Sequence, residues 1–212
     1  MEKPAREPKP REVRQVSLCL PDGDEEDFIR AAIERADHYV KTVRWPSHQS
    51  VYKAVLDSFQ VVYPVETLRL LCGFTAGGGF TGGLCGALSG GAAALGFIYG
   101  LTHPMPDPVY RRFMGTIFEQ GLTPGERVVE LIDTFWREGI YNHYFEAFRH
   151  KFGHTDCREL IRPFQDNPIS KERFVCCRRI VGETAGLAVR TVLAVEKDGP
   201  MSMGKNIYSH LL

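Results

Sequence analysis

The sequence predicts an all-α fold, a single-domain helical bundle in which a glycine-rich loop leads into a central buried helix. Two observations predict it. Apolar residues recur at three- and four-residue spacing in several long segments, and no convincing series of strands accompanies them. In addition, the window from Leu70 to Pro106 contains no Asp, Glu, Lys or Arg. A helix without charges is expected to lie buried among the others.

The elements follow in order along the chain. Residues 1–20 are expected to form a flexible arm, because prolines and charges dominate its first part. The helical domain is expected over 21–197, and 198–212 should form a loosely ordered tail. The six glycines between 73 and 83 predict a loop, which a helix of about 16 residues follows. The other helices are expected over 21–43, 47–63, 65–72, 108–120, 124–150 and 170–197.

Composition excludes several classes of protein. Lys plus Arg and Asp plus Glu both number 26, so a nucleic-acid partner is not expected. The charged N-terminus has no apolar stretch behind it, which argues against a signal peptide and for a cytoplasmic location. The uncharged window is interrupted by glycines and by "THPMPDP", so a membrane span is not expected either.

Six cysteines lie at 19, 72, 85, 157, 176 and 177. They are too few for a secreted disulfide scaffold, so in a reducing compartment they should be packing residues, ligands or redox groups. Cys85 lies near the start of a helix, where the dipole should lower its pKa and favour the thiolate. The alternative, a small apolar filler in a tight helix crossing, stays open on local features alone.

Three segments together carry a resemblance to a known family. "CGALSG" at 85–90, followed by "AAALGFIYG", resembles the CGAxxG motif of the C_GCAxxG_C_C family, which is described as redox-active or metal-binding. "FGHTDCREL" at 152–160 is similar to the FGxxxC segment of that family, and "CRRIVGETA" at 177–185 to its last cysteine-containing helix. A related domain occurs in split-Soret cytochromes, but this chain has no Cys-x-x-Cys-His, so c-type haem is not expected.

The resemblance implies a set of site residues. Cys85, Cys157 and Cys177 match the motif cysteines, and Cys177 is preferred to Cys176 because Val181 follows it by four residues. Ser47 stands where the family has its earliest cysteine. The expected metal ligands are Cys85, Cys157, Cys177, Cys72 and Ser47, and the expected cofactor-binding loop positions are Gly78, Gly79, Gly82, Gly83 and Gly86. Further nitrogen ligands are sought among His48, His103, His150 and His154.

The expected function is cysteine-based redox chemistry. An iron–sulfur cluster is the preferred cofactor, for electron transfer or for chemistry at an open iron, with Cys85 and Cys157 as the reactive pair of an oxidoreductase. Zinc, or no metal at all, is the alternative cofactor state. The alternative functions are a metal-free dithiol–disulfide protein or thiol sensor, and a scaffold with a degenerate site. The expected partner is a redox protein or a small-molecule substrate, and a homodimer is expected as well.

Overall fold

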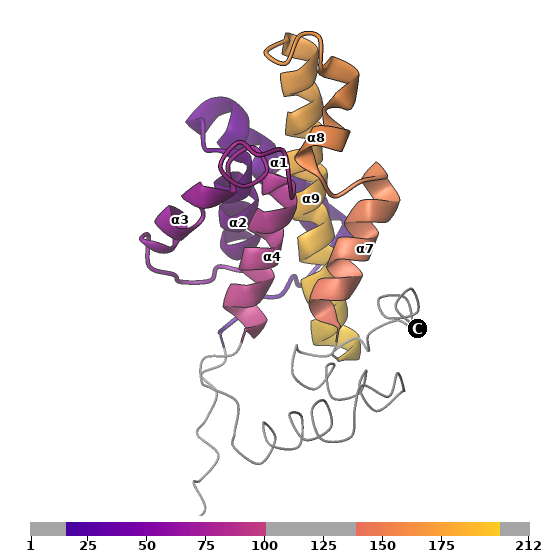
Figure 1. Ribbon diagram of the computed structural model, residues 1–212. Coiled ribbons are helices and arrows are strands. Elements are labelled where there is room, and N and C mark those ends of the chain that lie inside the picture. The colour runs from indigo at the N-terminus through magenta and orange to yellow at the C-terminus, as the bar shows by residue number, and fades with distance from the viewer. Residues whose placement is uncertain (1–15, 101–138, 200–212) are drawn as a thin grey trace, which may run out of the picture.

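The computed structural model describes residues 16–100 and 139–199 (Figure 1). Within these ranges the chain is helical, which confirms the all-α prediction, and its one β feature is an isolated bridge between Leu84 and Asp156. His103, the helix expected over 108–120 and most of the tail lie outside the described residues. The elements are α1 (Glu25–His38), the π-helical turn η1 (Tyr39–Val43), α2 (Ser47–Ser58), α3 (Thr67–Leu70), the 3-10 turn η2 (Cys72–Phe74), α4 (Gly86–Tyr99), α7 (Ile140–Phe152), α8 (Cys157–Leu160), the 3-10 turn η4 (Arg162–Phe164) and α9 (Lys171–Asp198).

Helix α4 occupies the centre of the bundle, as its lack of charge predicts. It packs against α2, α7 and α9, and its first six residues are all buried. The contact with α2 depends on Gly90, because a Cβ atom there would lie 2.1 Å from the backbone carbonyl oxygen of His48. Tyr144 of α7 approaches Gly91 in the same manner and donates a hydrogen bond to the carbonyl of Leu88 at 3.3 Å. Small residues on α4 therefore bring neighbouring helices close to its N-terminal half.

Helix α9 contacts α1, α2, α4 and α7. Its start is set by the side chain of Ser170, which accepts a hydrogen bond from the N–H of Arg173 at 3.2 Å. Helix α1 lies along α9, and the side chain of Ile33 fits over two glycines of that helix. At the edge of this contact Arg178 holds Asp37 through two nitrogens at 2.8–3.0 Å. The long helix expected over 170–197 is thereby confirmed.

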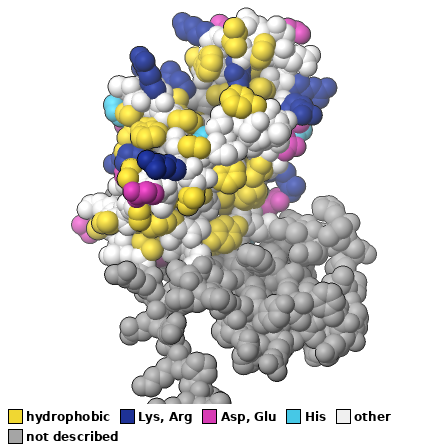
Figure 2. Space-filling view, turned by 60° about the vertical axis from the view of Figure 1, so that its left-hand side comes forward, with side chains coloured by type: hydrophobic (Ala, Val, Ile, Leu, Met, Phe, Trp, Pro, Cys, Tyr) yellow, Lys and Arg dark blue, Asp and Glu magenta, His cyan; other side chains and the backbone are white. Residues whose placement is uncertain are grey.

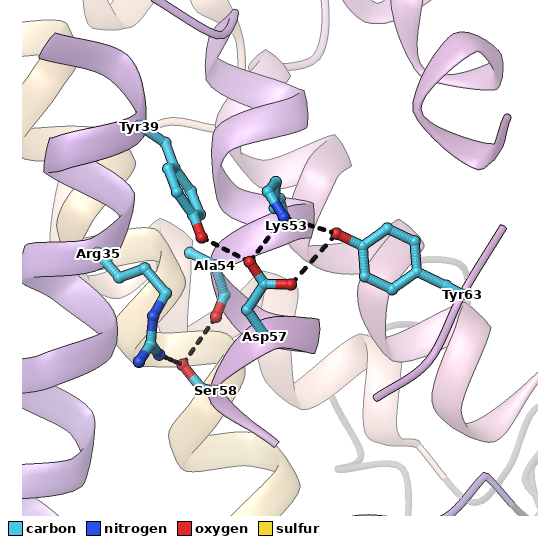
Figure 3. Close-up of polar contacts among 7 residues, drawn as sticks. All are labelled: Arg35, Tyr39, Lys53, Ala54, Asp57, Ser58 and Tyr63. Atoms are coloured by element: carbon cyan, nitrogen blue, oxygen red, sulfur yellow. Dashed lines mark hydrogen bonds and ion pairs between the residues drawn. The ribbon is translucent and has the colours of Figure 1, made fainter. Parts of the chain in front are cut away.

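A polar cluster joins η1 to α2 on the outer side of the bundle (Figure 3). The carboxylate of Asp57 accepts hydrogen bonds from Tyr39 at 2.5 Å, from Lys53 at 2.8 Å and from Tyr63 at 3.2 Å. Burial and the Asp57 carboxylate raise the pKa of Tyr39 to about 12. Because every member of this cluster is bonded to another, we interpret it as a structural connection between the π-helical turn and α2.

Two predicted helix boundaries are wrong. The helix expected over 47–63 ends at Ser58, because Gln60 adopts a left-handed backbone conformation with φ 53°. The helix expected over 124–150 does not run through residue 139, since Gly139 has φ 76° and α7 begins at Ile140. Separately, no helix in the described ranges has the length and apolarity that a membrane crossing requires.

Candidate functional site

Two short segments pair to build the base of the site. The N–H of Cys85 donates to the carbonyl of Thr155 at 2.8 Å, and the N–H of Cys157 donates to the carbonyl of Gly83 at 2.6 Å. Leu84 and Asp156 form the antiparallel bridge between these two bonds. The pairing fixes the end of the glycine-rich loop against the start of α8, so that Cys85, which caps α4, and Cys157, which begins α8, belong to paired segments.

Three thiols gather at this point. Cys85 is 8% exposed at the start of α4, whereas Cys157 and Cys177, the latter on α9, are partly buried. Cys157 and Cys177 raise the pKa of Cys85, and both Cys176 and Cys157 raise that of Cys177, so the three thiols lie within electrostatic range of one another. The structure therefore brings together the three cysteines that the resemblance implies.

The expected effect of the helix start on Cys85 is outweighed. Burial raises the pKa of Cys85 to about 11, although the N–H groups of Leu88 and Ala87 lower it as the dipole argument predicts. The prediction of a lowered pKa is therefore wrong, because desolvation of the buried thiolate raises the pKa of Cys85 by more than the N–H groups at the helix N-terminus lower it. Burial also raises the pKa of Cys157 and of Cys177, and the Arg173 guanidinium lowers both.

Several glycines of the loop take part in hydrogen bonds within the loop itself. The N–H groups of Gly82 and Gly83 donate to the carbonyls of Ala76 and Gly77 within the same loop, at 3.1 and 3.0 Å. Gly78 donates weakly to Phe74 at 3.5 Å, and a Cβ atom at Gly79 would have no neighbour within 4 Å. The backbone donors near the thiol of Cys85 are instead those of Ala87 and Leu88 on α4.

Ser47 and His48 border the first turn of α4. A Cβ atom at Gly86 would lie 2.9 Å from the hydroxyl oxygen of Ser47 and 3.5 Å from Nδ1 of His48. His48 is fully buried, with 0% exposure, and neither of its ring nitrogens has a hydrogen-bond partner. A buried polar group without a partner costs free energy, so it requires an explanation. Burial lowers the pKa of His48 and thus favours the neutral imidazole.

The remaining sequence candidates differ in how they relate to the three thiols, since Cys176 also raises the pKa of its neighbour Cys177 and His154 directly precedes Thr155, which accepts from the N–H of Cys85. Cys72 is exposed, and its sulfur accepts a long hydrogen bond of 3.5 Å from Nε2 of Gln49. Cys176 is partly buried and faces a different hollow, next to Val175 and Arg179. His150 and His154 are both exposed, and the exposed Cys19 lies in the extended segment before α1.

Three functional neighbours escaped the sequence argument. Arg173 lies one helical turn before Cys177, and Arg158 directly follows Cys157. This closeness in sequence to the site cysteines could have indicated that both arginines lie near the thiols. Tyr144 is fully buried, and both its burial and the nearby Cys85 raise its pKa. Nothing in the sequence marks Tyr144, since only the packing of α7 on α4 brings it to the site.

The donor set can be tested against metal groups of different size. Among the described residues, no three His, Cys, Asp or Glu side chains lie close enough together to hold a single metal ion. A tetrahedral zinc with Zn–S bonds of about 2.3 Å needs its sulfurs about 3.8 Å apart. An iron–sulfur cluster contains several irons, so its cysteines stand further apart. The described residues therefore do not offer the compact set of ligands that a single zinc ion held by three of them would need.

Comparison with known proteins agrees with this geometry. The family described as "Putative redox-active protein (C_GCAxxG_C_C)" matches residues 47–191, which include all three gathered cysteines. The chain belongs to this family. Searches among curated proteins and among solved structures gave no match. The family assignment makes cysteine-based redox chemistry the plausible activity of the site, and names no cofactor.

Proposed function

We propose that this member of the C_GCAxxG_C_C family is an iron–sulfur redox protein whose cluster is held by Cys85, Cys157 and Cys177. The observation that carries the proposal is the mutual electrostatic interaction of these three thiols at the paired starts of α4 and α8. Burial and the proximity of the thiols both oppose ionisation in the metal-free site. Positive iron would relieve both effects, because metal ligation replaces the thiol protons with a cation.

The same proposal assigns the fourth ligand position to His48. Ser47 occupies the place of the family cysteine but is a poor ligand for iron, and Cys72 is exposed, unlike the buried thiol of Cys85. His48 is adjacent to Ser47, lies against the first turn of α4 and has two buried nitrogens without partners. Ligation of iron would satisfy one of them. A cluster of this kind supplies one-electron transfer, and histidine ligation shifts its potential upward.

The raised thiol pKa values weigh against the metal-free alternative. A dithiol–disulfide protein or thiol sensor depends on a thiolate at neutral pH, which burial disfavours at all three positions. The structural scaffold with a degenerate site would not require three cysteines from separate segments to meet. A soluble redox partner or a small substrate, a homodimer and a cytoplasmic location remain predictions of this proposal.

The experiment that tests the proposal compares cysteine variants purified without oxygen. We expect C85S, C157S and C177S each to lose most of the bound iron and of the visible absorption. The matched controls are C72S and C176S, which should retain both. Circular dichroism must show unchanged helix content in every variant, so that loss of iron reports on ligation. Equal iron in the two groups of variants would contradict the proposed ligand set.

A further inference from the structure

A pocket opens directly over one of the three thiols. Its volume is about 330 Å³, and Cys157 lines it together with two arginines, Arg158 and Arg173. The residues of the glycine-rich loop form one wall, where Phe80 is 80% exposed. The pocket gives solvent access to a site in which the thiol of Cys85 is buried.

The two arginines retain unused hydrogen-bonding capacity. Arg158 donates through Nη2 to the carbonyl of Thr81 at 2.8 Å, and Arg173 donates through Nη1 to the carbonyl of Pro168 at 2.6 Å. In the described part of the chain neither guanidinium forms an ion pair with a carboxylate. The Nε atom of Arg173 is buried and has no hydrogen-bond partner. Because guanidinium donors bind oxyanions and carboxylates strongly, this arrangement is complementary to a negative ligand.

The backbone fixes the position of one of these arginines. Gly82 has φ 79°, and a Cβ atom there would lie 3.1 Å from Nε of Arg158, so the side chain packs flat on the glycine. The N–H of Arg158 also donates to the carbonyl of Gly82 at 2.9 Å. Among the residues that the structure describes, no acidic side chain lines this pocket. The nearby Asp156 and Glu159 line a neighbouring hollow, to which Arg158 also belongs.

The surrounding surface has the same character. At the upper end of the molecule, where Figure 1 places α8 and the start of α9, Figure 2 shows several Lys and Arg side chains beside hydrophobic ones, together with a few acidic ones. A small anion would therefore meet basic groups at the mouth of the pocket and an apolar wall at Phe80. The formal charge of the whole chain is zero, so it adds no net attraction for larger polyanions.

We propose that this pocket binds a small anion, an oxyanion or a carboxylate, over Cys157 and between the guanidinium groups of Arg158 and Arg173. The inference rests on the proposed function in one respect, in that the bound anion would be the substrate that reaches the redox site. Binding itself requires only the two arginines and the loop. The anion site and the cofactor can therefore be tested separately on one preparation of the full chain.

Inorganic phosphate is the probe, at constant ionic strength. Phenylglyoxal modifies accessible arginines, and mass spectrometry of the peptides gives the rate at each position. We expect phosphate to slow the modification of Arg158 and Arg173, and not that of Arg162, which is paired with Glu159 at 3.4 Å and does not line the pocket. Binding of phosphate, measured by calorimetry, should weaken about tenfold or more in R158Q and in R173Q, and less than about twofold in R162Q.

Each outcome decides between the alternatives. Equal protection of Arg162, or unchanged phosphate binding in R158Q and R173Q, would overturn the anion site and leave only general screening by salt. Iron analysis of the same sample separates the two proposals. Protein that contains no iron but binds phosphate through these arginines would support the anion site and contradict the proposed cluster. Protein that contains iron but does not bind phosphate would support the cluster and contradict the anion site.

Discussion

Two opposing influences act on the thiol of Cys85. The N–H groups of Ala87 and Leu88 favour the thiolate, whereas burial and the thiols of Cys157 and Cys177 favour the protonated form. Burial is the largest of these, so the metal-free site holds protons at neutral pH. Arg173 partly offsets the same penalty at Cys157 and Cys177. At the residue scale, the three thiols are therefore protonated and uncharged at neutral pH when no metal is bound.

The ionisation of Cys85 gives a prediction for metal-free, reduced protein. Since the pKa is raised to about 11, the folded state holds this proton more tightly than the unfolded state does. The contribution of Cys85 to stability is thus fully present below the unfolded pKa near 9 and falls as the pH rises from about 9 to 11. The expected loss is about 3 kcal/mol, at about 1.36 kcal/mol for each of the two pKa units.

Urea unfolding at pH 8, 9 and 10 measures about half of this loss. The C85A variant provides the control, because it lacks the titrating thiol and should show a smaller decrease over the same interval. The same decrease in both proteins would show that Cys85 does not titrate above its ordinary range.

The buried imidazole of His48 gives a second prediction at this scale. If His48 ligates a cluster, protein labelled with ¹⁵N at histidine and reduced with dithionite should show a ¹⁵N coupling in pulsed electron paramagnetic resonance. The coupling should vanish in H48N and persist in H150N, because His150 is exposed and lies near the C-terminal end of α7. Iron-loaded wild-type protein without the coupling would remove His48 from the ligand set, and would do so even if H48N failed to fold.

Close helix packing positions the site at the scale of elements. Helix α4 is held between α2 and α7 by glycines that admit the carbonyl of His48 and the ring of Tyr144. The pairing of the glycine-rich loop with the start of α8 then places Cys157 beside Cys85. Local sequence predicted the helices, but it could not predict this pairing, which joins segments that are far apart in the chain. The resemblance to the family, and not the spacing of the residues, pointed to the three cysteines.

The packing of α4 on α2 is tested by two alanine substitutions in one helix. G90A places a Cβ atom 2.1 Å from a backbone carbonyl oxygen, which must move for the helices to pack. We expect a loss of about 3 kcal/mol or more in the free energy of unfolding. At G96A the nearest atom lies 3.9 Å away, so the change should stay within about 1 kcal/mol, or stabilise the helix. Urea unfolding that gave equal values would contradict this account of the α2–α4 contact.

At the scale of the whole molecule, the fold class followed from helical spacing and from the charge-free window. The end of α2 and the start of α7 did not, because they depend on left-handed backbone at Gln60 and Gly139 that periodicity does not reveal. The direction of the pKa shift at Cys85 could not be predicted either, because the sequence indicates the helix start but not how deeply the thiol is buried. The closeness of Arg158 and Arg173 in sequence to the site cysteines could have placed them near the thiols. That both line one pocket with Cys157 became evident only from the structure.

The most direct test of the central claim is the iron and acid-labile sulfide content of the full chain purified without oxygen, with an absorption spectrum of the same sample. The account predicts a coloured protein with iron and sulfide in about equal amounts, about four of each for a cubane cluster. A colourless protein without iron or sulfide, purified and handled in this way, would contradict the proposed cluster and leave the three thiols to metal-free chemistry.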